Sequence, residues 1–254
     1  MGKNVVKVRI ALGRSIHENA AACYEDAKRA REKAEGVRAA MGETRSKMAA
    51  AEKKRKAVRV ARKREWFEEF HWSFTNSGRL ILAGKTAQQN DRLAKMMEDG
   101  DLFFHADIRG AAATVLRGGK GAGAPEKGEA AAIAASYSKA WGRRMASIDV
   151  YAVGRGQLSK HAVGGFVGAG GFAITGEREW FRNTGLVLAV GVEGNGRVSA
   201  GAENSGWLKK KVLVVPGKME KKEAAERIAQ ELGVPAAEVV PCLPSGKTSV
   251  IKRG

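Results

Sequence analysis

The first quarter of the chain carries an apolar stripe with the spacing of a coiled coil. Between residues 16 and 51 the apolar positions advance in alternating steps of four and three residues, with one polar exception. Five heptads of this spacing are typical of a helical seam that faces a partner. Ser15 and Glu18 have the S-x-x-E spacing of a capping box, which marks a helix start. We therefore predict a long coiled-coil helix within residues 14–65.

The predicted seam is thin because most of its side chains are alanine. Such a seam packs closely but weakly, and a helix cannot bury its own apolar stripe. We expect it to pair with a second helix, with a second copy of the chain or with a larger partner. Before this helix, residues 4–12 have a strand-like composition that Gly13 ends, which predicts a short strand within residues 1–13.

Strand-like and helix-like patterns are interspersed over the remaining three quarters. The strand-like runs are residues 70–74, 79–82, 101–108, 113–116, 147–153, 172–175, 185–192, 211–215, 239–240 and 249–251. The helix-like runs are residues 86–99, 129–141 and 220–232, and residues 117–128 are predicted to form a loop. The runs do not alternate strictly as βαβ units, so we expect an α+β fold in which helices pack on a mixed sheet. The expected domain spans residues 66–217, and residues 218–254 add a helix and short strands that pack on it.

Positive charge is concentrated in the predicted helix. The chain has 45 Lys and Arg against 27 Asp and Glu, a formal net charge of +18, and residues 1–65 hold 19 and 8 of these, a net +11. Eight of the twelve residues 53–64 are basic and none is acidic. This run is either a solvated helix end whose charges favour the helix dipole or a stripe that follows phosphates. The mutual repulsion of the eight cations favours the second alternative and indicates a polyanionic partner such as RNA, DNA or an anionic membrane face.

The sequence gives no sign of a membrane protein, a disulfide scaffold, a metal site or a nucleotide-binding P-loop. The sequence has no run of 18 apolar residues, so we predict no membrane span. Two distant cysteines, Cys23 and Cys242, make neither a disulfide scaffold nor a zinc site, which is typical of the reducing cytoplasm. The four histidines lack metal-ligand spacing, and residues 245–248 lack the first glycine of a P-loop. We expect a protein that is not an enzyme and that uses no cofactor or metal.

A set of motifs in the middle of the chain resembles one known family. The motifs are, in order, WFEEFHW at residues 66–72, SGRLILAGK at 77–85, AQQN at 87–90, GDLFFHAD at 100–107, YSKAW at 137–141 and QLSK at 157–160. Their order and spacing closely resemble the NFACT-R domain, the C-terminal RNA-binding module of the NFACT (fibronectin-binding-protein-A-like) ribosome quality-control proteins. Residues 17–36 are similar to the start of the coiled coil in archaeal members, and residues 214–218 to the closing strand of the family.

The resemblance implies an RNA-binding α+β domain with a role in translation. In the family a large N-terminal NFACT domain precedes the coiled coil, and the tailing of stalled nascent chains depends on it. This sequence starts almost at the coil, so we do not expect tailing by this chain alone. The resemblance and the charge run together give the candidate RNA-contacting residues: Lys53, Lys54, Arg55, Lys56, Arg59, Arg62, Lys63, Arg64, Lys85, Gln88, Gln89, Asn90, His105, Asp107, Arg109 and Lys160.

The candidates in the domain have structural alternatives that the sequence leaves open. The amides of residues 88–90 either hydrogen-bond RNA or cap and pack a helix. His105 and Asp107 face the same way on a strand, which fits an RNA contact or a hydrogen-bonded pair better than acid–base catalysis. Lys160 is either a phosphate contact or an ordinary surface lysine. The rings that are more typical of a core than of a base-stacking surface are Trp66, Phe70 and Trp72.

The leading hypothesis is a non-catalytic, cytoplasmic RNA-binding protein of translation or ribosome-associated quality control. It binds tRNA or large-subunit rRNA through the NFACT-R-like domain and the basic helix. One alternative is an accessory factor that holds tRNA for a separate modifying enzyme. Another is a dimeric coiled-coil module that binds nucleic acid without specificity, in which case RNA and DNA bind equally.

Overall fold

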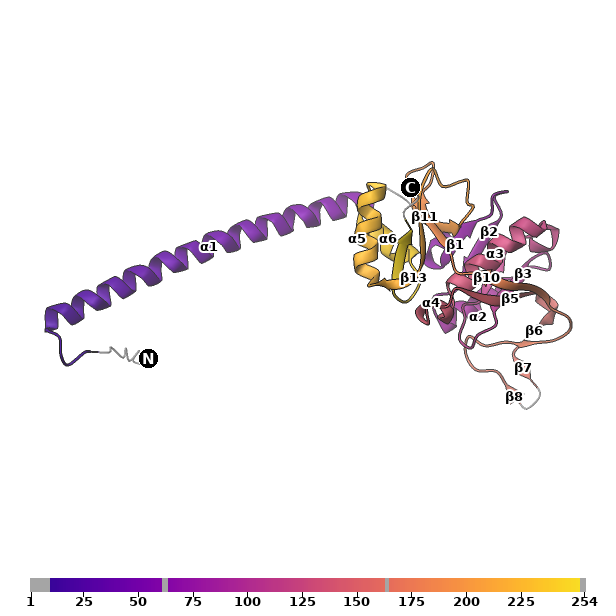
Figure 1. The fold of residues 1–254 in the computed structure, drawn as a ribbon, viewed down its shortest axis with the longest axis horizontal. Helices are drawn as coiled ribbons and strands as arrows, with labels where there is room; N and C mark the ends of the chain where they lie inside the picture. Colours follow the sequence, from indigo (N-terminus) through magenta and orange to yellow (C-terminus); the bar gives the residue numbers. More distant parts are fainter. Residues whose placement is uncertain (1–9, 61–63, 163–164, 252–254) are drawn as a thin grey trace. The chain divides into compact units, whose positions relative to one another are not determined.

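The chain divides into two units, Met1–Arg64 and Glu65–Gly254 (Figure 1). In this computed structural model the described residues are 10–60, 64–162 and 165–251, and the described side chains of the first unit are those of residues 10–47 and 64. The described part of the chain contains no helix whose length and hydropathy together would let it span a membrane. The first unit contains one long helix, and the second contains all the strands that are described.

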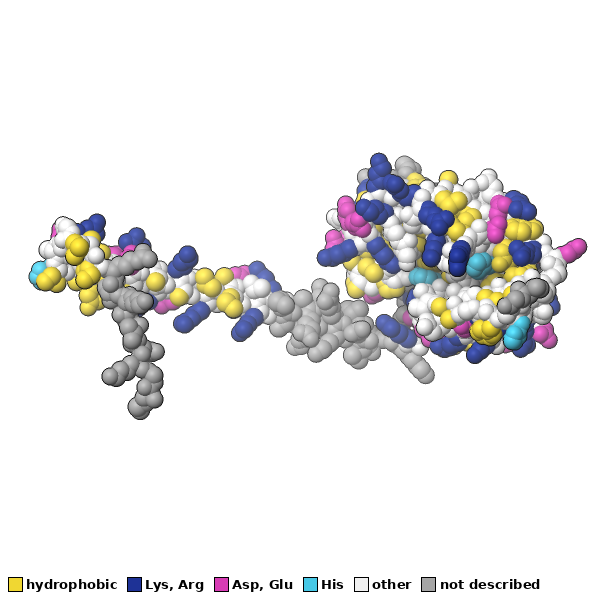
Figure 2. Space-filling view, turned by 90° about the horizontal axis from the view of Figure 1, so that it is seen from below, with side chains coloured by type: hydrophobic (Ala, Val, Ile, Leu, Met, Phe, Trp, Pro, Cys, Tyr) yellow, Lys and Arg dark blue, Asp and Glu magenta, His cyan; other side chains and the backbone are white. Residues whose placement is uncertain are grey.

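Helix α1 (Ile16–Val60) is the long helix expected from the apolar stripe. It begins at a capping box, in which the backbone N–H of Ser15 donates to the Glu18 carboxylate at 2.7 Å and the N–H of Glu18 donates to the Ser15 hydroxyl at 3.3 Å. The stripe residues Val37 and Met41 are 52% and 53% exposed. Figure 2 shows apolar side chains interspersed with charged ones along the described part of the helix. The pairing of this stripe with a second helix stays a prediction.

Only the end of the predicted N-terminal strand lies within the described residues. Residues 10–12 do not form a strand and instead lead into a turn before α1. The side chain of Asn19 fixes this turn, because its Oδ1 accepts the N–H of Ala11 at 2.8 Å and its Nδ2 donates to the Ala11 carbonyl at 3.1 Å. The strand prediction is therefore wrong for residues 10–12, and residues 4–9 lie outside the described residues.

A six-stranded sheet forms the body of the second unit. Its strands, in spatial order, are β1 (His71–Phe74), β2 (Leu80–Ala83), β4 (Thr114–Leu116), β3 (Leu102–Ala106), β5 (Ser147–Gly154) and β10 (Glu179–Gly185). Helix α3 (Ala124–Ser136) packs on one face, and helix α2 (Ala87–Lys95) packs on the other with the 3-10 helix η1 (Trp66–Glu69). Phe104 of β3 enters the apolar cluster on the α3 face, and Phe103 enters the cluster on the α2 face. Both faces of the sheet are therefore buried at β3.

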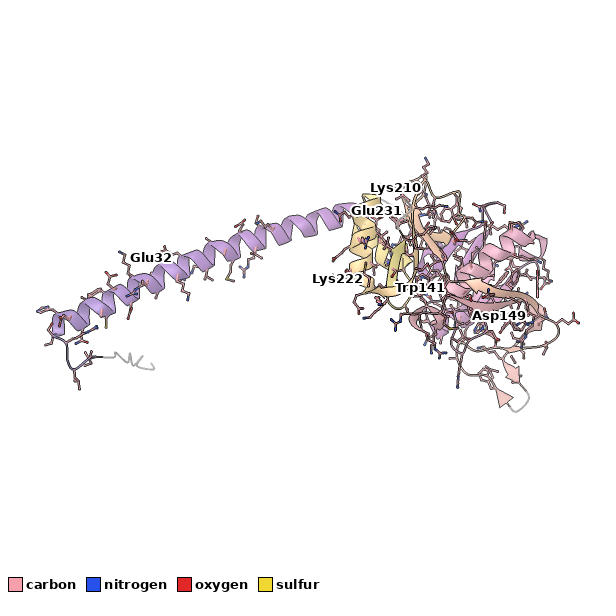
Figure 3. All side chains as sticks on the ribbon, in the orientation of Figure 1. Glu32, Trp141, Asp149, Lys210, Lys222 and Glu231 are labelled. Carbon is pink, nitrogen blue, oxygen red and sulfur yellow. The ribbon has the colours of Figure 1, made fainter. Side chains whose placement is uncertain are left out.

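A smaller four-stranded sheet lies toward the C-terminus. Its strands, in spatial order, are β12 (Val198–Ala202), β11 (Leu188–Val192), β13 (Lys210–Met219) and β14 (Thr248–Ile251). Helices α5 (Lys221–Leu232) and α6 (Ala236–Val239) pack against it. They share one apolar cluster with α3 and with Trp141 of α4 (Lys139–Gly142), which Figure 3 labels. The two sheets of the second unit therefore have a common core.

Between β5 and β10 the chain forms two small ladders. The paired strands are β6 (Leu158–Ser159) with β9 (Ala173–Ile174), and β7 (His161–Ala162) with β8 (Gly165–Phe166). The 3-10 helix η3 (Arg155–Gln157) leads from β5 into β6. Figure 1 shows β7 and β8 at the edge of the unit, where the Phe166 side chain is 71% exposed.

The α+β class is confirmed, as are most of the predicted elements of the second unit. At the start of α2 the hydroxyl of Thr86 accepts the N–H of Gln89 at 3.2 Å, as expected of a helix cap. All the strand pairings that the structure describes are antiparallel, so the expectation of a mixed sheet is wrong. Short connections such as residues 75–79 join antiparallel neighbours, whereas parallel neighbours need long crossovers.

The predicted loop at residues 117–128 contains the beginning of α3. Pro125 fits the first helical turn, where its missing N–H leaves no hydrogen bond unmade. The Glu126 side chain accepts the N–H of Gly123 at 2.9 Å, which caps the helix in the absence of a Ser or Thr. The proline and the glycines of this segment led to the prediction of a loop. In the structure Pro125 lies in the first turn of α3.

Two other predictions near helix ends are wrong. The helix predicted over residues 129–141 is divided, because Ser138 accepts the N–H of Ala140 at 3.1 Å and starts α4 as a separate helix. Residues 239–240 are helical rather than a strand, at the junction of α6 with the 3-10 helix η4 (Val240–Cys242). A pair of β-branched residues is too short a signal to separate a strand from a buried helical turn.

Candidate nucleic-acid interface

Three ring side chains lie side by side across β3, β5 and β10. His105 of β3 stands opposite Tyr151 of β5, and Tyr151 stands opposite Trp180 of β10. The ring centroids are 5.7 Å apart in the first pair and 5.5 Å apart in the second. Directly opposed residues point to the same face of a sheet, and Tyr151 belongs to the apolar cluster on the side away from α3. We call these three residues the aromatic row.

Two arginines cover the aromatic row. The guanidinium carbon of Arg178 lies 4.6 Å from the ring centre of Tyr151, and that of Arg182 lies 4.0 Å from the ring centre of Trp180. Both arginines are exposed, whereas Tyr151 beneath them is only 8% exposed. Cation–π attraction holds a guanidinium group over such rings. The outer surface therefore presents two planar cations that are backed by aromatic rings.

A bulge in β10 sets the position of Arg182. The register of β10 on β5 shifts at this point, and Asn183 has a positive φ of 51°. The N–H of Asn183 donates to Asp149 Oδ1 at 2.7 Å, and Arg182 donates to Asp149 Oδ2 at 2.6 Å. These two hydrogen bonds, the backbone bond most of all, lower the pKa of Asp149. Asp149, labelled in Figure 3, is therefore ionised near pH 7 and anchors Arg182 beside Trp180.

The histidine of the row is neutral near pH 7. Burial lowers the pKa of His105 most, and this effect outweighs the backbone hydrogen bonds to Ala106 and Ala111 and the carboxylate of Asp107, which raise it. The ring of His105 lies nearly parallel to that of Phe103, with 6.2 Å between the ring centroids and 8° between the planes. A neutral imidazole offers one donor and one acceptor. A neutral His105 therefore has no charge with which to pair with a phosphate.

The segment after β3 carries two further predicted residues. Asp107 and Arg109 are both exposed. The N–H of Asp107 donates to the carbonyl of Asp149 at 2.8 Å, which holds Asp107 against β5 next to the row. Gly110 has a φ of 80°, a left-handed conformation that favours glycine. The structure thus brings Asp107 to the edge of the aromatic row and leaves Arg109 in the exposed turn that follows.

Two of the predicted amide contacts are used inside the fold. Asn90 is 9% exposed, and its Oδ1 accepts the N–H of Ala113 at 3.1 Å. Gln89 accepts the N–H of Lys85 at 2.9 Å and donates to the Glu69 carbonyl at 3.2 Å. The ammonium of Lys85 donates to the same carbonyl at 2.8 Å. These contacts fasten the start of α2 to its neighbours, which is the packing alternative stated for the amides.

Lys160 and Gln88 differ in their surroundings. The ammonium of Lys160 pairs with Asp91 at 2.5 Å, donates to the Gly171 carbonyl at 2.7 Å and lies 4.3 Å from the ring centre of Phe172. Lys160 is therefore a partly buried and oriented cation. Gln88 is exposed on the first turn of α2.

The rings at the beginning of the second unit mostly belong to its core. Phe70 is 1% exposed, and Trp72 packs against the same apolar cluster. The guanidinium carbon of Arg197 lies 4.2 Å from a ring centre of Trp72. Trp66 is half exposed, at 50%. Phe70 and Trp72 therefore belong to the core rather than to a base-stacking surface.

The basic run of α1 lies mostly beyond what the structure describes. Its first members are placed in α1 by their backbone alone: Lys53, Lys54, Arg55, Lys56 and Arg59. Arg62 and Lys63 lie outside the described residues, and Arg64 is exposed. A role of the run in RNA binding stays a prediction.

Comparison with known proteins identifies the central part of the second unit. Residues 69–176 match the family model described as the NFACT protein RNA binding domain. The chain carries an NFACT-R domain. The resemblance seen in the sequence motifs is thereby confirmed, and the NFACT-R domain includes β3 and β5, which bear two members of the aromatic row.

Curated relatives and one solved structure are similar to this chain. The archaeal Rqc2 homolog aRqcH of Methanocaldococcus jannaschii is 34% identical over 206 residues, which are 77% of this chain and 31% of the relative. The ribosome quality control complex subunit NEMF of Homo sapiens is 32% identical over 136 residues, 52% of this chain and 12% of the relative. The C-terminal part of the fibronectin/fibrinogen-binding protein from Streptococcus suis is 29% identical with a TM-score of 0.40, and the match covers 49% of this chain and 47% of that chain. The chain thus spans less than a third of the length of these curated relatives.

The aromatic row continues past the matched NFACT-R residues. The residues that complete and cover it, Arg178, Trp180 and Arg182, follow within six positions of residue 176. These three residues were not predicted from the sequence because β10 was not recognised as a strand, and Tyr151 was not predicted because only the register of β5 between β3 and β10 places that ring in the row. The available signal was the placement of a basic or aromatic residue at every second position from 178 to 182, which puts all three side chains on one face of a strand.

Proposed function

We propose that this chain is a non-catalytic RNA-binding protein that acts in ribosome quality control. Its NFACT-R domain supports RNA binding, and its similarity to relatives named as ribosome quality control factors supports the process. The ligand in this proposal is tRNA or large-subunit rRNA. The basic run of residues 53–64 adds contacts to the phosphates.

The observation that supports the proposal most is the arginine-covered aromatic row. Unpaired RNA bases stack on aromatic rings and on the planes of arginine side chains, and Arg178 and Arg182 present such planes at the surface. Their charge also suits the neighbouring phosphates. Double-stranded RNA hides its base faces and is bound mainly through its backbone and its shape. We therefore expect the row to bind loops, bulges or ends of a structured RNA.

The test is an anisotropy titration of the purified chain against labelled tRNA and a length-matched DNA duplex at several salt concentrations. The double variant Arg178→Gln with Arg182→Gln is expected to lower the affinity for tRNA about ten-fold near physiological salt, because two stacking cations are lost. The matched control is Lys222→Gln with Arg227→Gln. It removes two exposed charges from α5 and is expected to lower the affinity less than about two-fold.

Three outcomes contradict parts of the proposal. If the two double variants lose equal affinity for tRNA, binding depends only on the net charge of the chain and not on the aromatic row. Equal affinity for tRNA and DNA that disappears as salt rises contradicts an RNA-specific domain and favours a nonspecific nucleic-acid module. A preference for tRNA without co-sedimentation with ribosomes favours the tRNA-modification accessory instead of a ribosome quality-control role.

A further inference from the structure

A hollow of about 190 Å³ lies where α2, η3 and β6 meet. The residues that matter for its chemistry are Asp91, Lys95, Arg155, Leu158, Lys160 and Phe172. Pockets that enclose drug-sized ligands span about 300–1,000 Å³. The hollow therefore suits one flat ring or one small anionic group rather than a whole cofactor.

The floor of the hollow is apolar and aromatic. Phe172 and Leu158 pack against the apolar cluster on the α2 face of the sheet. The ammonium of Lys160 lies over the ring of Phe172 and is fixed there by Asp91 and by the carbonyl of Gly171. A ring that enters the hollow therefore meets an aromatic surface and a cation that is already oriented.

The rim of the hollow is cationic. Lys95 and Arg155 are both exposed. The guanidinium of Arg155 lies 3.5 Å from the carboxylate of Asp99, whose side chain is 93% exposed, and so loose a surface pair contributes little. With Lys160 the lining holds three cations against the single carboxylate of Asp91. The cations on the rim therefore attract a ligand that carries a negative charge on each side of the ring that enters the hollow.

A chain of ring contacts connects the hollow with the aromatic row. The centroid of Phe172 lies 5.4 Å from that of Phe103, and Phe103 is stacked with His105 on the same strand. Phe103, Phe172 and Tyr151 belong to one cluster on one face of the sheet. The hollow and the aromatic row therefore lie on the same face of the sheet.

We propose that the hollow binds a single unpaired nucleotide of an RNA strand. The base lies against Phe172 and Leu158, and the phosphates on its two sides contact Lys95 and Arg155. Every base has a π face that can lie against the ammonium of Lys160 and the ring of Phe172, so this contact does not depend on the sequence of the RNA. A base held in a duplex cannot enter. This inference rests on the proposed function. It specifies which part of the RNA the hollow binds, namely one unpaired nucleotide.

The experiment compares a labelled ten-nucleotide oligouridine with a blunt ten-base-pair RNA duplex in anisotropy titrations. The double variant Lys95→Gln with Arg155→Gln is expected to lower the affinity for the single strand about ten-fold and that for the duplex less than about two-fold. The control Lys222→Gln with Arg227→Gln removes the same charge from α5 and is expected to change neither affinity more than about two-fold.

A second variant separates stacking from charge. Phe172→Leu keeps an apolar side chain under Lys160 but removes the aromatic face, and we expect a loss of about five-fold or more on the single strand alone. Thermal unfolding of each variant shows whether the fold is retained. Because the variant keeps the net charge, a loss on the single strand cannot come from a change in charge.

The outcomes separate this inference from the proposed function. Unchanged binding of the single strand by both variants, or equal losses on strand and duplex, overturns the hollow as a nucleotide site. If Arg178→Gln with Arg182→Gln still weakens tRNA binding in that case, the proposed function stands and only the hollow fails. No binding of the wild-type chain to the single strand, to the duplex or to tRNA overturns both.

Discussion

Asn90 connects three segments of the NFACT-R domain through one side chain. Its Oδ1 accepts the N–H of Ala113, and it leaves no room for a side chain at Gly84, where a Cβ would collide with the same oxygen. Replacement by alanine leaves the N–H of Ala113 buried without an acceptor. A buried donor without a partner costs about 1–3 kcal/mol.

We therefore expect Asn90→Ala to lower the free energy of unfolding by about 1–3 kcal/mol. Urea denaturation measures this change. Gln88→Ala, two positions earlier and exposed, is the control and is expected to leave stability unchanged. If instead Asn90→Ala is as stable as the wild type and binds tRNA more weakly, Asn90 contacts RNA and the packing explanation is wrong.

His71 of β1 is a buried titratable group in the same domain. Its ring stacks on Tyr137 with 3.9 Å between the centroids, and its Nδ1 has no hydrogen-bond partner among the described residues. Burial above all, followed by the charges of Lys85 and Lys221, lowers the pKa of His71 to about 3. In the unfolded chain a histidine titrates near pH 6.5. Between these two values the unfolded state binds more protons, so His71 lowers stability as the pH falls below about 6.5.

We expect His71→Phe to make stability less dependent on pH. Phenylalanine keeps a ring against Tyr137 and cannot bind a proton, and the removed effect is at most about 1.4 kcal/mol per pH unit. Urea unfolding at pH 7 and pH 5 measures it. His161→Phe changes an exposed histidine and serves as the control. The same pH dependence in wild type and His71→Phe contradicts the depressed pKa.

At the scale of elements, the sequence identified those strands that carry a strong apolar signal. Strands β3 and β5 are rich in large apolar residues because both faces of the sheet are covered at that point, and both were predicted. Strand β12 was not predicted, since its sequence VSAGA consists mostly of small residues that also suit turns and helices. Burial of β12 comes from the surrounding sheet and not from the size of its own side chains.

Strand β10 was missed for a different reason, and with it Trp180 of the aromatic row and the covering Arg182. It is an edge strand with exposed polar residues, and the bulge at Asn183 interrupts its alternation. The motifs identified His105 as a candidate. Its neighbours in the row, Tyr151 and Trp180, are far from it in sequence and are brought next to it only by the register of the strands. Register depends on which strands become neighbours, so a single sequence could suggest one residue of the site and not the group.

At the scale of the whole molecule, charge is divided unequally between the helical segment and the rest. Residues 1–65 carry a net +11, and the remaining 189 residues carry +7 (26 − 19). If the run at 53–64 follows phosphates, it makes electrostatic contacts that depend on salt, while the aromatic row contributes stacking that depends on salt much less. Each phosphate contact contributes about 0.7–0.9 to the slope of log affinity against log salt.

Removing four positive charges from the basic run is therefore expected to lower that slope for tRNA by about three. The test set is Lys53, Lys54, Arg55 and Lys56, each changed to Gln. The control set takes four cations from earlier in the same helix: Lys28, Arg31, Lys33 and Arg38, each changed to Gln. Both sets reduce the net charge equally, so a larger change in slope for the first set shows that position matters. An equal change for both sets means that RNA responds only to the total charge of the helix, and that residues 53–64 are a solvated helix end.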